Sequence, residues 1–323
     1  MIQVIIPTYN RPLCIQYLIE KSLNQYTGDL FEFLVLDSST NEETQKLIDR
    51  LGYKSNLIYQ KIDSAVQPDD KVINAVTACR TEYYWLFGDG NLADFNAIES
   101  ILKNLAYSQY DVVEIENATS KRNLKGGKEG FFREEDLIAY IASNFTHLTY
   151  WGATIIKTEK AKYLFKSGRM DKYRQDELSW WCACLICEMI DYQGVEDTSI
   201  GIFYTKDLAG NPGKRDRSWA KGEKYFITTF EVFNRDVDML PSLFEPVKCK
   251  IIKNFRDDCL VRKGYLIQLK LDNVLKPEYV WKYRKDIQAV EGYYLFMLTL
   301  SITPDFLLKA IRGLYKTVKR KIK

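Results

Sequence analysis

The chain has 323 residues, of which 46% are hydrophobic and 28% are charged. This composition excludes a disordered chain, because the apolar fraction is sufficient for a sizeable core, and the length suits two domains or one large domain with an appendage. Lys plus Arg (46) nearly balance Asp plus Glu (43), so the net charge of +3 indicates no particular partner.

Strand-like and helix-like segments alternate over the first 116 residues. Strands are predicted at 2–7, 31–37, 57–60, 83–87 and 110–116, and helices at 12–26, 42–51, 70–79 and 94–106. Such alternation predicts right-handed βαβ units and a mostly parallel sheet. The nearly unbroken apolar strands predict burial on both faces of that sheet.

Beyond residue 116 the pattern changes twice. A polar, Gly-rich loop is predicted at 117–130, a strand at 151–157, a helix at 175–192 and a polar loop at 206–222. From residue 223 onward helical spacing dominates. The sequence therefore predicts an α/β domain over 1–222 and a helical C-terminal region over 223–323.

Several features concern the location of the protein. No apolar run reaches the roughly 18 residues of a membrane-spanning helix. The start MIQVIIPTYN has no basic region and reaches Pro7 early, so no signal peptide is expected. Seven scattered cysteines favour reduced thiols and a cytoplasmic protein. They are Cys14, Cys79, Cys182, Cys184, Cys187, Cys249 and Cys259.

Three predicted strands end in polar motifs, namely TYNR, DSST and GDGN. Ligands of parallel sheets bind beyond the carboxyl ends of the strands. Asp37 can accept hydrogen bonds from a ribose hydroxyl or a base, or it can cap the helix at 42–51. Asp89 and Asn91 offer oxygens suited to Mg²⁺ or Mn²⁺ with a diphosphate, although Asp-Gly is also a common turn.

Together VIIPTYNRP, the Asp of FLVLDSST and YYWLFGDGN resemble the nucleotide-binding half of the family 2 glycosyltransferases. The resemblance is clear over about 1–120 and thinner over 150–220. It implies a GT-A fold and an inverting enzyme that uses a nucleotide sugar.

The resemblance also implies a nucleotide-sugar site built from four segments. Asp37 would hold the uracil or the ribose. The other implied residues are Pro7, Thr8, Tyr9, Arg11, Asp70, Lys71, Asn74, Gly88 and Asp89.

The GDGN motif matches a bacterial variant of the family that reads G-D-D-D. Asp89 and Asn91 are therefore the candidate ligands for Mn²⁺ or Mg²⁺, but Gly90 and Asn91 replace two aspartates. Asn is a neutral and weaker ligand for a hard cation. Weak metal binding and metal-free catalysis both stay open.

The segment RQDELSWW, at 174–181, contains the candidate catalytic base. Inversion needs a carboxylate that takes the acceptor hydroxyl proton, and the resemblance favours Asp176, followed by Glu177. The alternative is that these two residues only complement the dipole of the helix they start.

Lys214, Arg215 and Arg217 lie in the predicted polar loop. They can close over the donor and neutralise its diphosphate, or the loop is simply a solvated surface. His147, the only histidine, can contact metal or substrate, although a lone histidine is a poor candidate for the base.

The C-terminal segment 305–323 carries seven Lys or Arg and one Asp. Its apolar residues recur at helical spacing, a pattern typical of an interfacial helix on anionic lipid. Docking on its own domain, a dimer contact and nucleic-acid binding are the alternatives. Nucleic acid is not expected, because the rest of the chain is net negative and lacks a recognisable motif.

The sequence therefore predicts an inverting glycosyltransferase that moves a sugar from a nucleotide sugar, expected to be a UDP-sugar, to a hydroxyl of a glycan. The motifs do not specify the sugar. A lipid-linked acceptor in bacterial surface-polysaccharide synthesis, such as capsule or O-antigen, is expected at the inner face of the membrane. The alternative is a non-catalytic sugar-nucleotide-binding or scaffold protein with a degenerate metal site.

Overall fold

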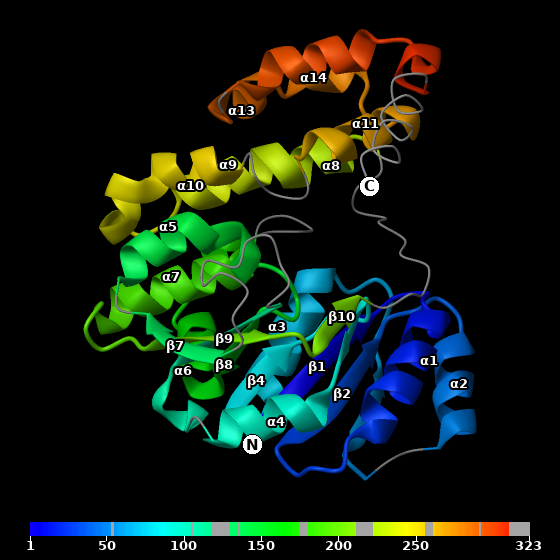
Figure 1. Ribbon diagram of the computed structural model, residues 1–323, viewed down its shortest axis with the longest axis vertical. Coiled ribbons are helices and arrows are strands. Elements are labelled where there is room, and N and C mark those ends of the chain that lie inside the picture. Colours follow the sequence, from blue (N-terminus) through cyan, green and yellow to red (C-terminus); the bar gives the residue numbers. More distant parts are fainter. Residues whose placement is uncertain are drawn as a thin grey trace, which may run out of the picture.

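The computed structural model of the chain describes most of its residues (Figure 1). They are 1–52, 55–104, 106–117, 130–134, 136–174, 180–210, 222–255, 261–290 and 292–309. A sheet with helices on both faces forms one part, and a layer of helices lies beyond one end of it (Figure 1).

Eight strands form one mixed sheet in the order β3-β2-β1-β4-β8-β6-β9-β7. The strands are β1 (Ile2–Thr8), β2 (Phe31–Asp37), β3 (Leu57–Lys61), β4 (Tyr83–Leu86), β6 (Val112–Asn117), β7 (Gly130–Glu134), β8 (Thr154–Lys157) and β9 (Ile200–Thr205). β1 pairs in parallel with β2 and β4, β2 with β3, and β6 with β9. β8 is antiparallel to β4 and β6, and β7 to β9. The mostly parallel α/β sheet expected from the sequence is confirmed.

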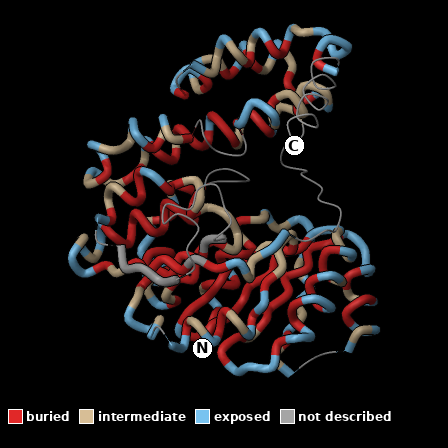
Figure 2. The backbone as a smooth tube through the Cα atoms, viewed as in Figure 1, coloured by how far each residue is buried: buried red, intermediate tan, exposed pale blue. Residues whose placement is uncertain are grey.

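Burial on both faces explains the apolar strands. All seven residues of β1 are buried. Ile2, Val4 and Ile6 point into one core cluster, and Ile5 into the other. Figure 2 shows the central strands as buried along most of their length.

Two sets of helices cover the two faces. The first set packs on the cluster that contains Val4, and consists of α1 (Pro12–Lys21), α2 (Glu43–Leu51) and α4 (Phe95–Asn104). The second packs on the cluster that contains Ile5, and consists of α3 (Pro68–Ala78), α5 (Leu137–Leu148), α6 (Thr158–Lys166) and α7 (Trp181–Gln193). Short 3₁₀ turns are η1 (Leu23–Gln25), η2 (Tyr107–Gln109) and η3 (Asp171–Tyr173).

A separate two-stranded ribbon joins β5 (Asn91–Ala93) to β10 (Leu208–Gly210) in antiparallel pairing. β10 lies in the predicted loop 206–222, of which residues 211–221 are outside the described part.

Every described element after β10 is helical. The α-helices are α8 (Lys224–Phe226), α9 (Phe233–Asp238), α10 (Lys248–Phe255), α11 (Lys263–Leu271), α12 (Pro277–Lys282), α13 (Arg284–Ala289) and α14 (Tyr293–Ile302). A π-helical segment, η5 (Ile227–Val232), and a 3₁₀ segment, η6 (Ser242–Val247), complete the region. None of the described helices has the length and apolarity needed to cross a membrane.

The core continues from the sheet into these C-terminal helices. The cluster containing Ile5 also includes Phe233, Phe255 and Met297. Asn254 Nδ2 donates to the Ala142 carbonyl oxygen at 2.9 Å, which links α10 to α5. The domain division at residue 222 therefore stays a prediction, because side chains from both sides share one core.

Candidate functional site

The three polar motifs meet at one edge of the sheet because their strands are neighbours. Thr8 at the end of β1 pairs in register with Asp37 at the end of β2. On the other side of β1, the Phe87 backbone N–H donates to the Ile5 carbonyl oxygen at 2.8 Å, just before GDGN. Side chains following all three strands can therefore reach a common ligand.

Asp89 accepts hydrogen bonds from two residues of the first motif. Thr8 Oγ1 donates to Asp89 Oδ2 at 2.9 Å, and Arg11 Nη1 lies 3.0 Å from Asp89 Oδ1. Asp89 is buried, whereas the Arg11 side chain keeps 26% of its surface exposed. The structure thus brings Thr8, Arg11 and Asp89 together, with a partly exposed guanidinium beside the carboxylate.

The loop after β1 is fastened to the loop after β2. Asn10 has a φ of 52°, a left-handed conformation that Asn tolerates better than most residues. Its backbone N–H donates to Ser39 Oγ at 2.8 Å, and its Oδ1 accepts from the Thr40 N–H at 3.1 Å. Next to it Tyr9 is 46% exposed, while Pro7 is buried within β1.

Asp37 is a buried carboxylate with several donors. Tyr59 Oη donates to its Oδ2 at 2.8 Å, Lys61 Nζ donates to the same oxygen at 3.2 Å, and the Ser39 N–H donates to Oδ1 at 2.8 Å. Burial alone raises the pKa of Asp37, but hydrogen bonds from Ser39, Tyr59 and Lys61 outweigh it and lower the pKa below its ordinary value. The site therefore holds a fixed negative charge at neutral pH.

Sequence reasoning missed Tyr59 and Lys61. Both lie in β3, and Lys61 pairs in register with Asp37. The available signal was that the predicted strand at 57–60 follows the Asp37 strand along the chain, with Tyr59 and Lys61 at its end. Their role was not derivable without the register that places these side chains against Asp37.

Lys71 lies beneath this charged cluster. It is buried, and its ammonium donates to the Ser38 hydroxyl. Burial lowers the pKa of Lys71, and the nearby negative charge of Asp37 opposes that shift. Asn74, one turn further along α3, is exposed. Lys71 thus lies beside the Asp37 charge, whereas Asn74 faces solvent.

Asp70 forms an ion pair that the sequence did not indicate. Arg174 Nη2 lies 2.7 Å from Asp70 Oδ1, which joins the start of α3 to the residue that follows η3. Arg174 lies two residues before the candidate base Asp176, and both Asp176 and Glu177 lie outside the described residues. In the sequence, only the place of Arg174 in RQDE, beside the candidate bases, indicated that it could belong to the site.

The far side of that segment is held by the C-terminal region. Trp180 donates its backbone N–H to Asp236 Oδ2 at 2.8 Å and its indole Nε1–H to the Thr228 carbonyl oxygen at 3.0 Å. Asp236 lies in α9 and is fully buried. Residues on both sides of 175–179 are therefore fixed, one to α3 and the other to α9.

The candidate cations of the donor loop, Lys214, Arg215 and Arg217, also lie outside the described residues. They stay a prediction.

Asn91 makes a specific contact with the backbone. Its Nδ2 donates to the Trp151 carbonyl oxygen at 2.6 Å, just before β8. Gly152 follows with a φ of 113°, and a Cβ there would lie 2.9 Å from Asn91 Nδ2. Because a carbonyl oxygen needs a donor, this contact favours an amide over a carboxylate at position 91.

This geometry also tests the expected metal site. Mg²⁺ and Mn²⁺ favour several oxygen ligands, with carboxylates providing charge. Asp89 already pairs with Arg11, and Asn91 directs its amide N–H at Trp151. No group of three His, Cys, Asp or Glu side chains in the described part of the chain could hold an ion. The described residues do not fit a divalent cation, and the expected metal stays a prediction.

A buried carboxylate lies close to the histidine. His147 Nε2, at the end of α5, is 3.3 Å from Glu114 Oε1 on β6. Glu114 is fully buried, and the His147 side chain is 17% exposed. His147 lies four residues before Trp151, whose carbonyl oxygen accepts the hydrogen bond from Asn91. Sequence reasoning did not include Glu114, because the acidic residues of this strand form no recognisable motif.

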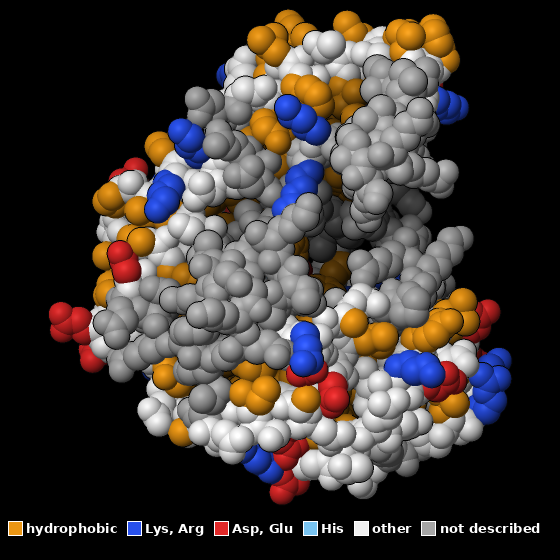
Figure 3. Space-filling view, viewed as in Figure 1, with side chains coloured by type: hydrophobic (Ala, Val, Ile, Leu, Met, Phe, Trp, Pro, Cys, Tyr) orange, Lys and Arg blue, Asp and Glu red, His pale blue; other side chains and the backbone are white. Residues whose placement is uncertain are grey.

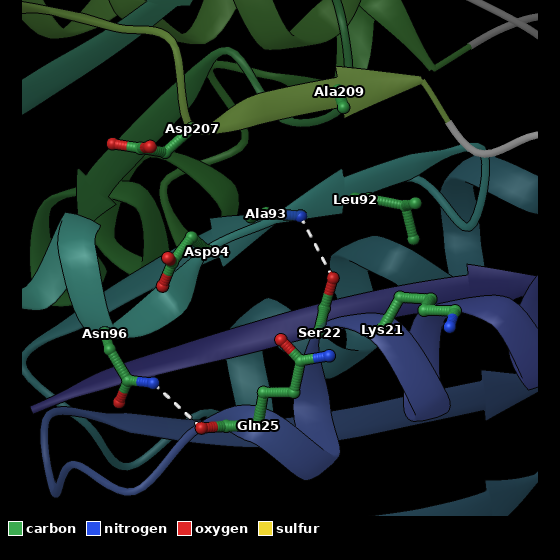
Figure 4. A pocket seen from close by; sticks show the side chains of 9 residues that line it. All are labelled: Lys21, Ser22, Gln25, Leu92, Ala93, Asp94, Asn96, Asp207 and Ala209. Atoms are coloured by element: carbon green, nitrogen blue, oxygen red, sulfur yellow. Dashed lines mark hydrogen bonds between the residues drawn. The ribbon is translucent and has the colours of Figure 1, made fainter.

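A separate small cavity lies beside the β5–β10 ribbon (Figure 4). Its volume is about 170 Å³, and its lining includes Ser22, Asp94 and Asp207. Ser22 Oγ accepts the Ala93 N–H at 3.1 Å there. None of the predicted site residues lines this cavity, so it is not part of the candidate site.

Comparison with known proteins identifies both the domain and the fold. The family model described as "Glycosyl transferase family 2" matches residues 3–163. No curated protein matches the chain significantly.

Solved structures match over nearly the whole chain. S. aureus TarS 1–349 in complex with UDP-GlcNAc is 15% identical, with a TM-score of 0.54, covering 92% of this chain and 83% of that one. Mannosyltransferase PcManGT from Pyrobaculum calidifontis, in complex with GDP-Man and Mn²⁺, is 13% identical, with a TM-score of 0.52. That match covers 98% of this chain and 87% of the other. At these identities the likeness establishes the GT-A fold.

Proposed function

The chain belongs to glycosyl transferase family 2 through residues 3–163, and on that premise we propose that it transfers a sugar from a UDP-sugar to a hydroxyl of a glycan. One observation carries the proposal. The ends of β1, β2 and β4 bring Thr8, Arg11, Asp37 and Asp89 to one edge of a parallel sheet. The UDP-GlcNAc complex of TarS, which shares the fold, supports a UDP-sugar as the donor.

The proposed roles in donor binding follow from charge and position. Asp37, held by Tyr59 and Lys61, recognises the nucleoside through an ionised carboxylate. Arg11 keeps part of its guanidinium exposed beside Asp89, where it can bind the diphosphate. Pro7, Tyr9, Lys71, Asn74, Asp70 and Gly88 complete the proposed donor site.

The proposed reaction is an inverting displacement. The acceptor oxygen bonds to the anomeric carbon, the bond from that carbon to the diphosphate breaks, and Asp176 or Glu177 takes the hydroxyl proton. The ion pair of Arg174 with Asp70 supports this assignment, because it fixes the residue preceding the base segment beside the donor half.

We further propose that protein cations, rather than a metal, stabilise the leaving diphosphate. Arg11 is already paired where the family's acidic motif lies, and Asn91 contributes no charge. Lys214, Arg215 and Arg217 are the proposed additional cations. A fixed guanidinium can stabilise the charge that develops on a leaving group.

The proposed acceptor is a lipid-linked glycan in the synthesis of a bacterial surface polysaccharide. The seven Lys or Arg of residues 305–323 support a peripheral position on the inner face of an anionic membrane. The proposal of this acceptor rests on the basic segment and on the family.

A panel of nucleotide sugars, including UDP-GlcNAc and GDP-Man, tests the proposal. We expect saturable binding and slow hydrolysis of one UDP-sugar by the purified chain, retained when EDTA replaces Mn²⁺. Hydrolysis that EDTA abolishes would show that the reaction depends on a metal ion. Failure to bind any nucleotide sugar would contradict the proposed function.

A non-catalytic sugar-nucleotide-binding protein is the second candidate, and Asn91 in the acidic motif favours it. It predicts donor binding without turnover even when glycan acceptors are present. Asp176→Asn separates the two candidates. In an enzyme this change abolishes transfer and preserves donor binding, whereas a binding protein shows no transfer to lose.

A further inference from the structure

An apolar face is exposed on the C-terminal helices. Leu295 and Ile302 of α14 are 72% and 65% exposed, and Phe306 just beyond the helix is 69% exposed. Leu295 and Ile302 are seven residues apart, which places them on one side of the helix. We call Leu295, Ile302, Phe306 and the 44% exposed Leu307 the apolar end face.

The apolar end face lies at one end of the molecule. Figure 1 places α14 farthest from the sheet, and Figure 3 shows hydrophobic side chains gathered at that end. α14 has the sequence YYLFMLTLSI, without a charged residue. Its inner side already packs Met297 and Leu300 into the core. A helix that is apolar on its outer side as well has a second apolar surface available for a partner.

Charge distribution indicates the chemistry of that partner. Residues 223–323 contain 20 Lys or Arg and 12 Asp or Glu, a net charge of +8, whereas residues 1–222 carry −5. Phe296 belongs to α14, the helix that bears the face. Lys263 Nζ, on α11, lies 5.7 Å from the centre of the Phe296 ring. Lys309 is exposed directly after the face. Exposed apolar side chains next to cations such as Lys263 and Lys309 are typical of a surface that enters an anionic lipid interface.

We propose that the apolar end face inserts into the headgroup boundary of a bilayer containing anionic lipids. The proposal adds a defined insertion surface to the basic segment 305–323, and it builds on the proposed lipid-linked acceptor. With α14 at the bilayer, the C-terminal helices lie between the lipid and the sheet that bears the donor site (Figure 1). A second copy of the chain and residues 310–323 are the other possible occupants of the face.

Vesicle cosedimentation of the full chain tests this surface. The probes are phosphatidylcholine vesicles with and without phosphatidylglycerol. We expect binding only to the anionic vesicles, and a loss of about tenfold or more when Leu295, Ile302 and Phe306 are all replaced by Ser. The matched control is Ile58→Ser, which removes an equally apolar, 44% exposed side chain from β3 and should leave vesicle binding unchanged.

Two further measurements decide between the occupants. Light scattering of the wild-type chain should report a monomer without vesicles, and a dimer that the triple variant abolishes would overturn the proposal. Absence of vesicle binding by the wild-type chain, as expected if residues 310–323 cover the face, would also overturn it. Donor binding measured on the same samples separates the hypotheses. Donor binding without vesicle binding contradicts only the proposed membrane-binding face. Vesicle binding without donor binding contradicts only the proposed function.

Discussion

Asp37 has a buried carboxylate that accepts several hydrogen bonds. Its charge receives hydrogen bonds from Ser39, Tyr59 and Lys61 while its side chain is fully buried. Removing the charge while keeping the shape leaves these donors beside a neutral amide. We expect Asp37→Asn to reduce the free energy of unfolding by about 2 kcal/mol at neutral pH, measured by urea denaturation.

The lowered pKa of Asp37 also predicts how the stability effect of Asp37→Asn changes with pH. Because the folded-state pKa of Asp37 is lowered, its stabilisation is present above the unfolded pKa of about 3.9 and is lost as pH falls below it. The difference in stability between wild type and Asp37→Asn should therefore shrink in acid. Asp29→Asn is the control, since Asp29 is paired but 87% exposed, and it should change stability little. A difference that grows in acid would contradict the assignment.

Asn91 supports a second prediction. Asn91→Asp sets a carboxylate against the Trp151 carbonyl oxygen, which now accepts from the amide at 2.6 Å. We expect a loss of about 2 kcal/mol in stability, read as a lower Tm. The control is Asn96→Asp, which breaks an amide-to-carbonyl bond with Gln25 at an exposed position and should cost less. Equal Tm values for the wild type and Asn91→Asp would show that the contact is unimportant.

At the residue scale, the functional roles assigned from the sequence motifs stay predictions, although the structure shows where some of these residues meet. Thr8, Arg11 and Asp89 were predicted from strand-end motifs, and the structure brings them into contact. Tyr59 and Glu114 belong to no motif. Their importance comes from the register of neighbouring strands and from helix packing, which one sequence does not specify.

At the scale of elements, the sequence predicts most of the regular βαβ half and, beyond it, the strand β8, the helix α7 and the helical C-terminal region. The strands and helices up to residue 104 follow clean hydrophobic periodicity, although the predicted helix 12–26 ends at Lys21 and continues as the short η1. β7, β9, α5 and α6 were not predicted. α5 is apolar on most of its surface, with seven buried residues. The spacing of apolar residues alone cannot distinguish such a buried helix from a buried strand.

The link between α3 and η3 is a prediction at this scale. Arg174 and Asp70 keep 33% and 44% of their side chains exposed, so their ion pair contributes less than about 1 kcal/mol to folding. Its proposed effect is on the geometry of the base segment. We therefore expect Arg174→Gln to lower the transfer rate about tenfold, with little change in Tm or in donor KM.

The control for that link is Lys162→Gln, which breaks the pair of the 14% exposed Lys162 with the 81% exposed Glu159 on α6. It should leave both rate and Tm unchanged. If Arg174→Gln and the wild type transfer sugar at similar rates, the ion pair has no role in catalysis. Restored activity in the double variant Asp70→Arg, Arg174→Asp would support that role.

At the scale of the whole molecule, sequence reasoning predicted two regions but not how strongly they are joined. The change to helical elements after residue 222 follows the periodicity. The contacts between the regions follow from tertiary packing. Tyr173 donates its hydroxyl to the Met239 carbonyl oxygen at 3.1 Å, and Trp180 donates to Asp236. The C-terminal helices therefore complete the core of the catalytic half as well as extending it.

That shared core leads to a prediction about truncation. A chain ending at residue 222 exposes the outer sides of α5 and α7 and leaves the Ala142 carbonyl oxygen without the Asn254 amide. We expect this fragment to lose cooperative thermal unfolding, followed by circular dichroism, because the lost core contains aromatic side chains such as Phe233 and Phe255. A chain ending at residue 309 keeps every described element and should unfold cooperatively. If the shorter fragment also melts in one sharp transition and binds donor, residues 1–222 form an independent domain and the shared core is dispensable.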